Sequence, residues 1–247
     1  MHFFSEVFTY FSTRANWTGS GGIPNLFYKQ ALLSATVVVA ATLVGGGLGL
    51  VLGHTGRGGL VAVNAANAFR AVPTLALLTL LAIQPSISLK YNGFLAAFIA
   101  LVVLAIPPIL TNTYVGIREV DADIVDASRA MGLTGPQILG RVELPLGLPF
   151  IVAGIRTASI EVVATSTLAA YVSYQDLGTP VLAGLASQNT VEAFCGSLLV
   201  AVLAAIVAIG LGLVLKAVTP AALRKTSAPT SLLPGAVSAR PQPAAAG

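Results

Sequence analysis

Two side chains of opposite charge, Arg70 and Glu161, stand inside long apolar segments of the sequence. If those segments cross a membrane, each charge costs at least about 2.5–3.5 kcal/mol near the centre of the bilayer. Counting outward from Gly59 and from Leu146 places both charges at similar depth, so we expect a pair. The pair could only hold two helices together, or it could line or gate a pathway. Glu161 could also attract a cationic solute.

A second group of polar residues lies in residues 115–144, the most charged part of the chain. Asp121 or Asp123 can cap the first turn of a short helix, where a carboxylate also meets the positive end of the helix dipole. Gly132 stands where that helix would end with a positive φ. Residues 134–137, Thr-Gly-Pro-Gln, match a capping box that starts a second short helix. The two helices would present small and apolar side chains, namely Ile124, Ala127, Ser128 and Met131 on the first and Ile138, Leu139 and Val142 on the second.

Such a surface suits docking of a soluble partner, although a plain solvated connection between two spans would also explain it. The histidines and the cysteine of the sequence do not indicate catalysis. His2 and His54 have no CxxC or HExxH companion, so we expect no metal site, and Cys195 is the single cysteine. The sequence contains no GxxxxGK[ST] phosphate-binding loop. We therefore expect neither a cofactor nor an enzyme, and a membrane-embedded enzyme is disfavoured because no nucleophile–base set is present.

The composition explains why charges are so few. Hydrophobic residues make up 55% of the 247 residues and charged residues 9%, against about 25% charged residues in soluble domains. Lipid can face Leu, Val and Ala directly, so a membrane protein needs no polar surface of the usual extent. The net charge of +4 is better explained by membrane orientation than by nucleic-acid binding.

Five apolar stretches are long enough to cross a bilayer as helices, which takes about 20 residues. They are residues 31–53, 59–83, 93–114, 146–172 and 193–215. The sequence thus predicts an all-α membrane protein with about five transmembrane helices, carried by residues 31–216. Residues 173–191 are interrupted by Gly and Pro, which favours a re-entrant or surface segment.

The remaining regions suggest an orientation. Residues 1–30 are rich in aromatic residues and suit an interfacial segment outside the cytoplasm, and residues 217–247, rich in Ala, Pro and Ser, suit a disordered tail. If residues 115–144 are cytoplasmic, the inner side carries most of the basic residues, namely Arg57, Arg118, Arg129, Arg141, Lys216, Arg224, Lys225 and Arg240. The outer side then carries only Arg14, Lys29 and Lys90. The positive-inside rule therefore predicts an outer N-terminus and a cytoplasmic C-terminus.

The spacing in residues 126–145 resembles the coupling motif of ABC importer permeases, which runs Glu-Ala-Ala, three residues, Gly, nine residues, Ile-x-Leu-Pro. Here it reads Asp126-Ala127-Ser128, three residues, Gly132, nine residues, Val142-Glu143-Leu144-Pro145. The resemblance implies a type I ABC importer permease fold with a two-helix cytoplasmic coupling loop. It also implies that Asp126, Ala127, Ser128, Gly132, Val142, Leu144 and Pro145 dock on an ATPase subunit.

Residues 69–81, 107–132 and 142–172 further resemble permeases of the osmoprotectant branch, which import glycine betaine, choline and carnitine. The likeness covers roughly residues 28–216. This resemblance implies several partners: cytoplasmic ABC ATPase subunits, an external solute-binding protein, a second permease chain (identical or paralogous) and the lipid bilayer. Residues 175–178, Gln-Asp-Leu-Gly, depart from the Gly-Gly-Leu-Gly often found there. The alternatives are a permease for another small solute such as an amino acid, and a stand-alone secondary transporter or channel, which leaves the loop motif unexplained.

Overall fold

The computed structural model describes residues 2–84 and 93–219. Most of the predicted tail (217–247) and Lys90 lie outside this part of the chain. The described residues form helices and the segments that connect them. Four helical stretches are long and apolar enough to cross a membrane: Ile23–Thr55, Phe94–Arg118, Gly135–Val172 and Thr190–Val218. This confirms the predicted all-helical membrane fold.

The first of these stretches combines α2 (Ile23–Ala41), a π-helical turn (Thr42–Gly46) and α3 (Gly47–Thr55). It begins at Ile23, earlier than the predicted 31, because Pro24 is favourable in the first turn of a helix. The N–H that proline lacks would have no partner within the helix at that position. The last stretch is a single helix, α12 (Thr190–Val218), which Asn189 caps by accepting the N–H of Glu192.

The second predicted span, residues 59–83, is not one helix. It consists of α4 (Gly59–Phe69) and α5 (Thr74–Ile83), which meet at an angle of 75°. The break precedes Pro73, which has no N–H to donate and restricts the residue before it to extended conformations. Arg70 consequently caps the C-terminal end of α4 and lies at the bend rather than within a continuous helix.

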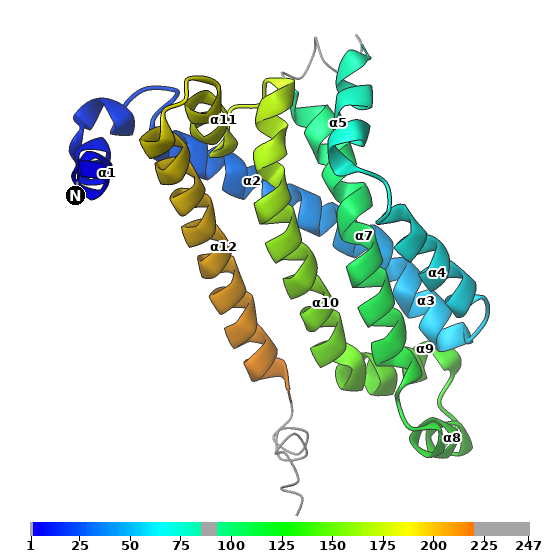
Figure 1. Ribbon diagram of the computed structural model, residues 1–247. Helices are drawn as coiled ribbons and strands as arrows, with labels where there is room; N and C mark the ends of the chain where they lie inside the picture. Colours follow the sequence, from blue (N-terminus) through cyan, green and yellow to red (C-terminus); the bar gives the residue numbers. More distant parts are fainter. Residues whose placement is uncertain (1, 85–92, 220–247) are drawn as a thin grey trace, which may run out of the picture.

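The helix α7 (Phe94–Arg118) is the common neighbour of the bundle: α2, α3, α4, α5 and α10 (Leu144–Thr165) all pack against it. In Figure 1 it lies between α10 on one side and α4 and α5 on the other. Its buried residues Leu101 and Ile109 join Leu33 and Val37 of α2 and Val162 of α10 in the main apolar core.

The fourth span is longer than predicted, because the second helix of the loop is continuous with it. The short helix α9 (Gly135–Ile138) runs through a π-helical segment (Leu139–Glu143) into α10, which is followed by a 3₁₀ segment (Ser166–Val172). The sequence pattern predicts a start at residue 146. Pro145 cannot donate a backbone hydrogen bond. The helix nevertheless continues through it, and a wider π-helical turn directly precedes it.

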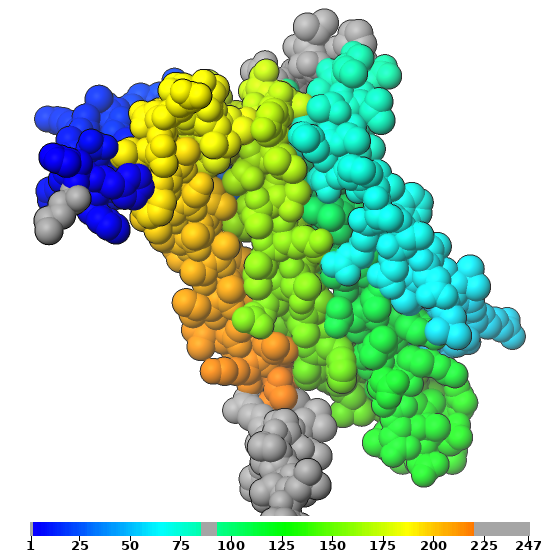
Figure 2. Space-filling view, in the orientation of Figure 1, coloured from blue at the N-terminus to red at the C-terminus, as the bar shows by residue number. Residues whose placement is uncertain are grey.

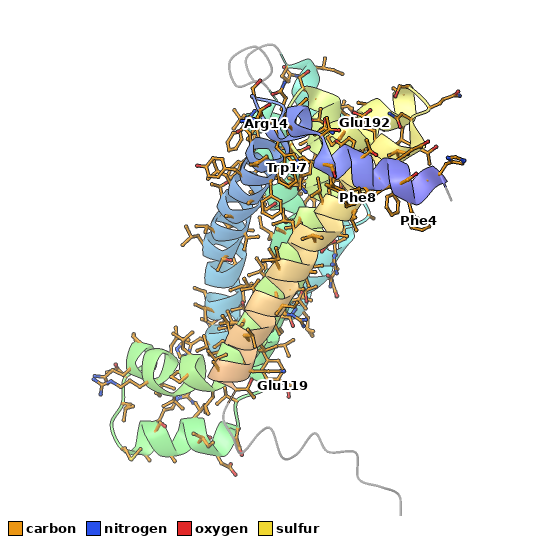
Figure 3. The ribbon with its side chains drawn as sticks, turned by 90° about the vertical axis from the view of Figure 1, so that its left-hand side faces the viewer. Phe4, Phe8, Arg14, Trp17, Glu119 and Glu192 are labelled. Carbon is orange, nitrogen blue, oxygen red and sulfur yellow. The ribbon has the colours of Figure 1, made fainter. Side chains whose placement is uncertain are left out.

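The two ends of the bundle carry different short elements. The loop helix α8 (Ala122–Ala130) lies at one end, and Figure 2 shows this part of the chain protruding from the bundle. The opposite end carries α1 (His2–Ser12), a 3₁₀ turn (Arg14–Trp17) and α11 (Gly178–Ala186), which packs on α12. In Figure 3, Arg14, Trp17 and Glu192 lie at that end and Glu119 at the loop end.

Candidate docking loop and intramembrane ion pair

The caps predicted for the loop are present. Asp121 Oδ1 accepts the backbone N–H of Asp123 at 2.9 Å, which fixes the start of α8. Gly132 follows the helix with a φ of +86°. The backbone N–H of Thr134 donates to Gln137 Oε1 at 2.9 Å within a capping box. The local sequence therefore determines where both short helices begin.

The solvent-facing side of α8 is mixed in character. Ile124 and Met131 are exposed, and so is Asp126, which accepts from Arg129 at 3.2 Å. Ala127 is exposed as well. Ser128 was expected on the same surface, but it is buried and donates to the Ile124 carbonyl at 2.7 Å. The prediction that Ser128 belongs to the exposed stripe is therefore wrong. Its hydroxyl faces inward and is satisfied by a backbone carbonyl of the same helix.

The second half of the motif is less exposed than the first. Val142 and Leu144 are half-buried and Pro145 is exposed, whereas Ile138, which we expected at the surface, is buried. The prediction that Ile138 lies on the surface of the loop is therefore wrong. The reason is that α9 is the first turn of a long packed helix rather than an independent surface helix.

The structure reveals a polar contact at the base of the loop that the sequence did not indicate. His54, in the last turn of α3, lies with Nδ1 2.6 Å from Oε2 of Glu143, the variable position of the Ile-x-Leu-Pro element. The Glu143 side chain is only 7% exposed. Both residues border a polar cavity of about 300 Å³ that also contacts Asp126 and Arg129 of α8. The first span is thus joined to the loop by a side-chain contact that a separation of 89 residues hides from sequence patterns.

The predicted pairing of Arg70 with Glu161 is present. Arg70 Nη2 lies 3.0 Å from Glu161 Oε2, and the two side chains are 41% and 29% exposed. The pair joins the bend between α4 and α5 to α10. It lies on a different part of the fold from the loop residues 122–138.

Two more polar side chains join the spans. Arg156 of α10 donates from Nε to the Ala208 carbonyl of α12 at 3.1 Å. Gln30 of α2 is fully buried, donates to the Val163 carbonyl and accepts the N–H of Leu177, both at 3.0 Å. Among the described residues, no group of three His, Cys, Asp or Glu side chains is placed to hold a metal ion.

These observations define a multi-span helical membrane protein with a capped, exposed helical loop outside the bundle. The chain belongs to the family of binding-protein-dependent transport system inner membrane components, whose model matches residues 36–225. It is accordingly a transport permease.

Relatives with assigned transport roles match most of the chain. It is 31% identical to the carnitine transport permease protein OpuCB of Listeria monocytogenes, over 80% of this chain and 88% of the relative. It is 30% identical to the choline transport system permease protein OpuBB of Bacillus subtilis, over 84% and 94%. The glycine betaine/carnitine/choline permease protein OpuCB of B. subtilis is 31% identical, over 81% and 91%.

The fold is also that of a solved transporter. A chain of the inward-facing MetNI methionine ABC transporter superposes with a TM-score of 0.68 at 24% identity, covering 80% of this chain and 96% of that one. At this identity the likeness shows the shared fold only, and so the type I importer architecture.

Asp176, in the segment between the fourth and last spans, is fully buried. Its Oδ1 accepts the N–H of Gly178 at 2.8 Å, while Oδ2 has no hydrogen-bond partner in the described part of the chain. Burial raises the pKa of the Asp176 carboxyl from 3.8 to about 7, although the backbone N–H of Gly178 acts in the opposite direction.

This pKa predicts the pH dependence of stability. Between about pH 4 and pH 7 the folded protein retains a proton that the unfolded chain releases, so stability falls as pH rises through this range and levels off above it. The loss is at most about 4 kcal/mol, at about 1.4 kcal/mol per tenfold change in proton affinity. In Asp176→Asn this fall should disappear from thermal unfolding curves recorded in detergent between pH 4.5 and 8. Glu6→Gln, at an exposed position, is the matched control; parallel curves for Asp176→Asn and wild type would refute the assignment.

Proposed function

We propose that the chain is the membrane-spanning subunit of an ATP-driven importer for quaternary ammonium osmoprotectants such as glycine betaine, carnitine or choline. The observation that carries the proposal is the similarity to permeases of these solutes over nearly their whole lengths. The methionine transporter is similar in fold at 24% identity, which does not favour an amino-acid substrate.

Deletion of the chain should abolish high-affinity uptake of at least one of these solutes and slow growth recovery in high salt. Uptake of radiolabelled glycine betaine, carnitine and choline, with and without ATP depletion, tests this directly. Uptake that persists after ATP depletion but collapses with the ion gradient would indicate a secondary transporter instead. Unchanged uptake of all three solutes, with loss of an unrelated solute, would show that the substrate class is wrong.

The loop is the part of the chain that we propose docks on the ATPase subunit. Its conformation is fixed by the caps of Asp121 and Thr134, and its exposed face includes Ile124 and Met131. The His54–Glu143 contact at its base joins it to the first span, and α9 is continuous with α10. These features suit a segment that transmits movement, because a partner that displaces the loop must also displace two spans.

Gly132→Val is expected to uncouple transport while leaving the permease in the membrane. Apart from the chain neighbours, no described residue has an atom within 4 Å of an added Cβ at Gly132, but a side chain at φ +86° strains the backbone and redirects α9. Uptake should fall about fivefold or more, since the strain is of order 1–3 kcal/mol and acts at the docking surface. ATPase co-purification should weaken in parallel.

Gly58→Val is the matched control, since Gly58 also has a positive φ of +68° and open space around a Cβ but lies outside the loop. It should retain the ATPase. Asp126→Lys, which reverses an exposed charge on α8, should behave like Gly132→Val. Uptake above about half of the wild-type rate for Gly132→Val, with the ATPase still attached, would contradict docking by this loop.

We also propose that the loop end is cytoplasmic and the end bearing α1 and α11 external. The basic residues Arg57, Arg118, Arg129 and Arg141 lie in or beside connections at the loop end, as the positive-inside rule requires of the cytoplasmic side. The exposed Phe4 and Phe8 of α1 (Figure 3) suit the lipid–water interface at the other side. Two permease chains, identical or paralogous, and an external solute-binding protein complete the proposed importer.

Single cysteines can test this orientation. Cys195 is buried and can be replaced by Ser, after which the exposed residues Ser20 and Ala130 at opposite ends are suitable labelling positions. A membrane-impermeant thiol reagent applied to intact cells should label Ser20→Cys and not Ala130→Cys, and permeabilised cells should label both. Labelling of Ala130→Cys in intact cells would reverse the orientation and remove the loop from the ATPase.

A further inference from the structure

The Arg70–Glu161 pair joins two parts of the bundle that both pack on a third helix, α7. The helices α4 and α5 pack on one flank of α7, and α10 packs on the other. Figure 1 shows α7 between these flanks. The pair therefore connects the bend of the second span to the fourth span across α7. With side chains 41% and 29% exposed, it lies at a surface of this chain rather than in its core.

Opening this pair is costly unless something replaces both partners. Separated charges in a membrane interior lose their mutual attraction without regaining full hydration. A solute that carries one positive and one negative charge can take the place of each partner in turn, so no charge is left alone. A solute that carries only a positive charge can replace Arg70 beside Glu161, but it leaves Arg70 unpaired.

The chemistry of the two side chains fits such a solute. The planar guanidinium of Arg70 can bind a carboxylate through two parallel hydrogen bonds. A quaternary ammonium group has no N–H, so it is held by opposite charge and by aromatic faces. Glu161 supplies that charge.

We propose that Arg70 and Glu161 form a solute-contact site of the permease itself, which takes a zwitterion by exchange: the solute carboxylate binds Arg70 while its quaternary ammonium group lies against Glu161. The inference rests on the proposed function and narrows its substrate class to betaine-like zwitterions. It implies that the permease adds a preference for glycine betaine and carnitine over choline to whatever selection the binding protein makes.

The test is the ratio of glycine betaine uptake to choline uptake by the complete importer, with the same binding protein throughout. In Arg70→Gln this ratio should fall about tenfold or more, because the carboxylate loses a charge-assisted hydrogen bond that choline never makes. The neutral double variant Arg70→Gln/Glu161→Gln buries no unpaired charge, so it should accumulate normally. It should also lose the preference for the zwitterion.

A purely structural ion pair predicts a different result. The double variant would then keep the wild-type ratio, and Arg70→Gln would lower uptake of both solutes equally; either finding overturns the proposal. Arg156→Gln is the matched control, since Arg156 bonds the Ala208 carbonyl rather than a carboxylate, and it should leave the ratio unchanged.

The wild-type importer separates the two proposals. If it takes up choline but neither zwitterion, the exchange site is refuted while the osmoprotectant function stands. If it takes up none of the three solutes, the proposed function fails and the exchange site fails with it.

Discussion

Close packing of helices against α7 is the constraint on which the rest of the structure depends. Lipid is as apolar as the helices, so burial of apolar surface drives their association weakly, and close backbone contact must contribute instead. An added Cβ at Gly49 would lie 2.7 Å from Thr113 Cβ, and one at Gly53 equally close to Ile117 Cβ. On the opposite flank, an added Cβ at Gly147 would lie 2.8 Å from the Gly116 carbonyl oxygen. Small residues thus bring α3 and α10 against the same helix.

This packing determines where the functional groups lie. Because α3 and α10 contact α7 near its C-terminal end, His54 of α3 and Glu143, just before α10, meet at the base of the loop. Arg156, in the middle of α10, donates to the Ala208 carbonyl of α12, and Gln30 of α2 donates to the Val163 carbonyl near the far end of α10. Unsatisfied polar groups are costly in lipid, so these bonds constrain how α2, α10 and α12 can move relative to one another.

The features set by local chemistry were predictable from the sequence, and those set by distant contacts were not. Short-range geometry determines the caps at Asp121 and Thr134 and the positive φ of Gly132. The pairing of Arg70 with Glu161 was predictable because few charges stand in apolar segments, and the cost of burial leaves little choice of partner. The contact of His54 with Glu143 has no such signal, since neither residue stands in an apolar run. The bend before Pro73 was missed because the mostly apolar run of residues 59–83 suggested one helix.

The continuity of the fourth span relates the loop to the ion pair. Residues from Gly135 to Val172 form one helical stretch that begins in the loop and carries Glu161 in its later part. Arg70, by contrast, lies at a break in its own span and can shift without displacing a continuous helix. A force that tilts the loop end is therefore carried along α10 to Glu161, while Arg70 stays with α4. Such a movement would change the distance between the two charges. A solute able to replace both partners would lower the cost of that change.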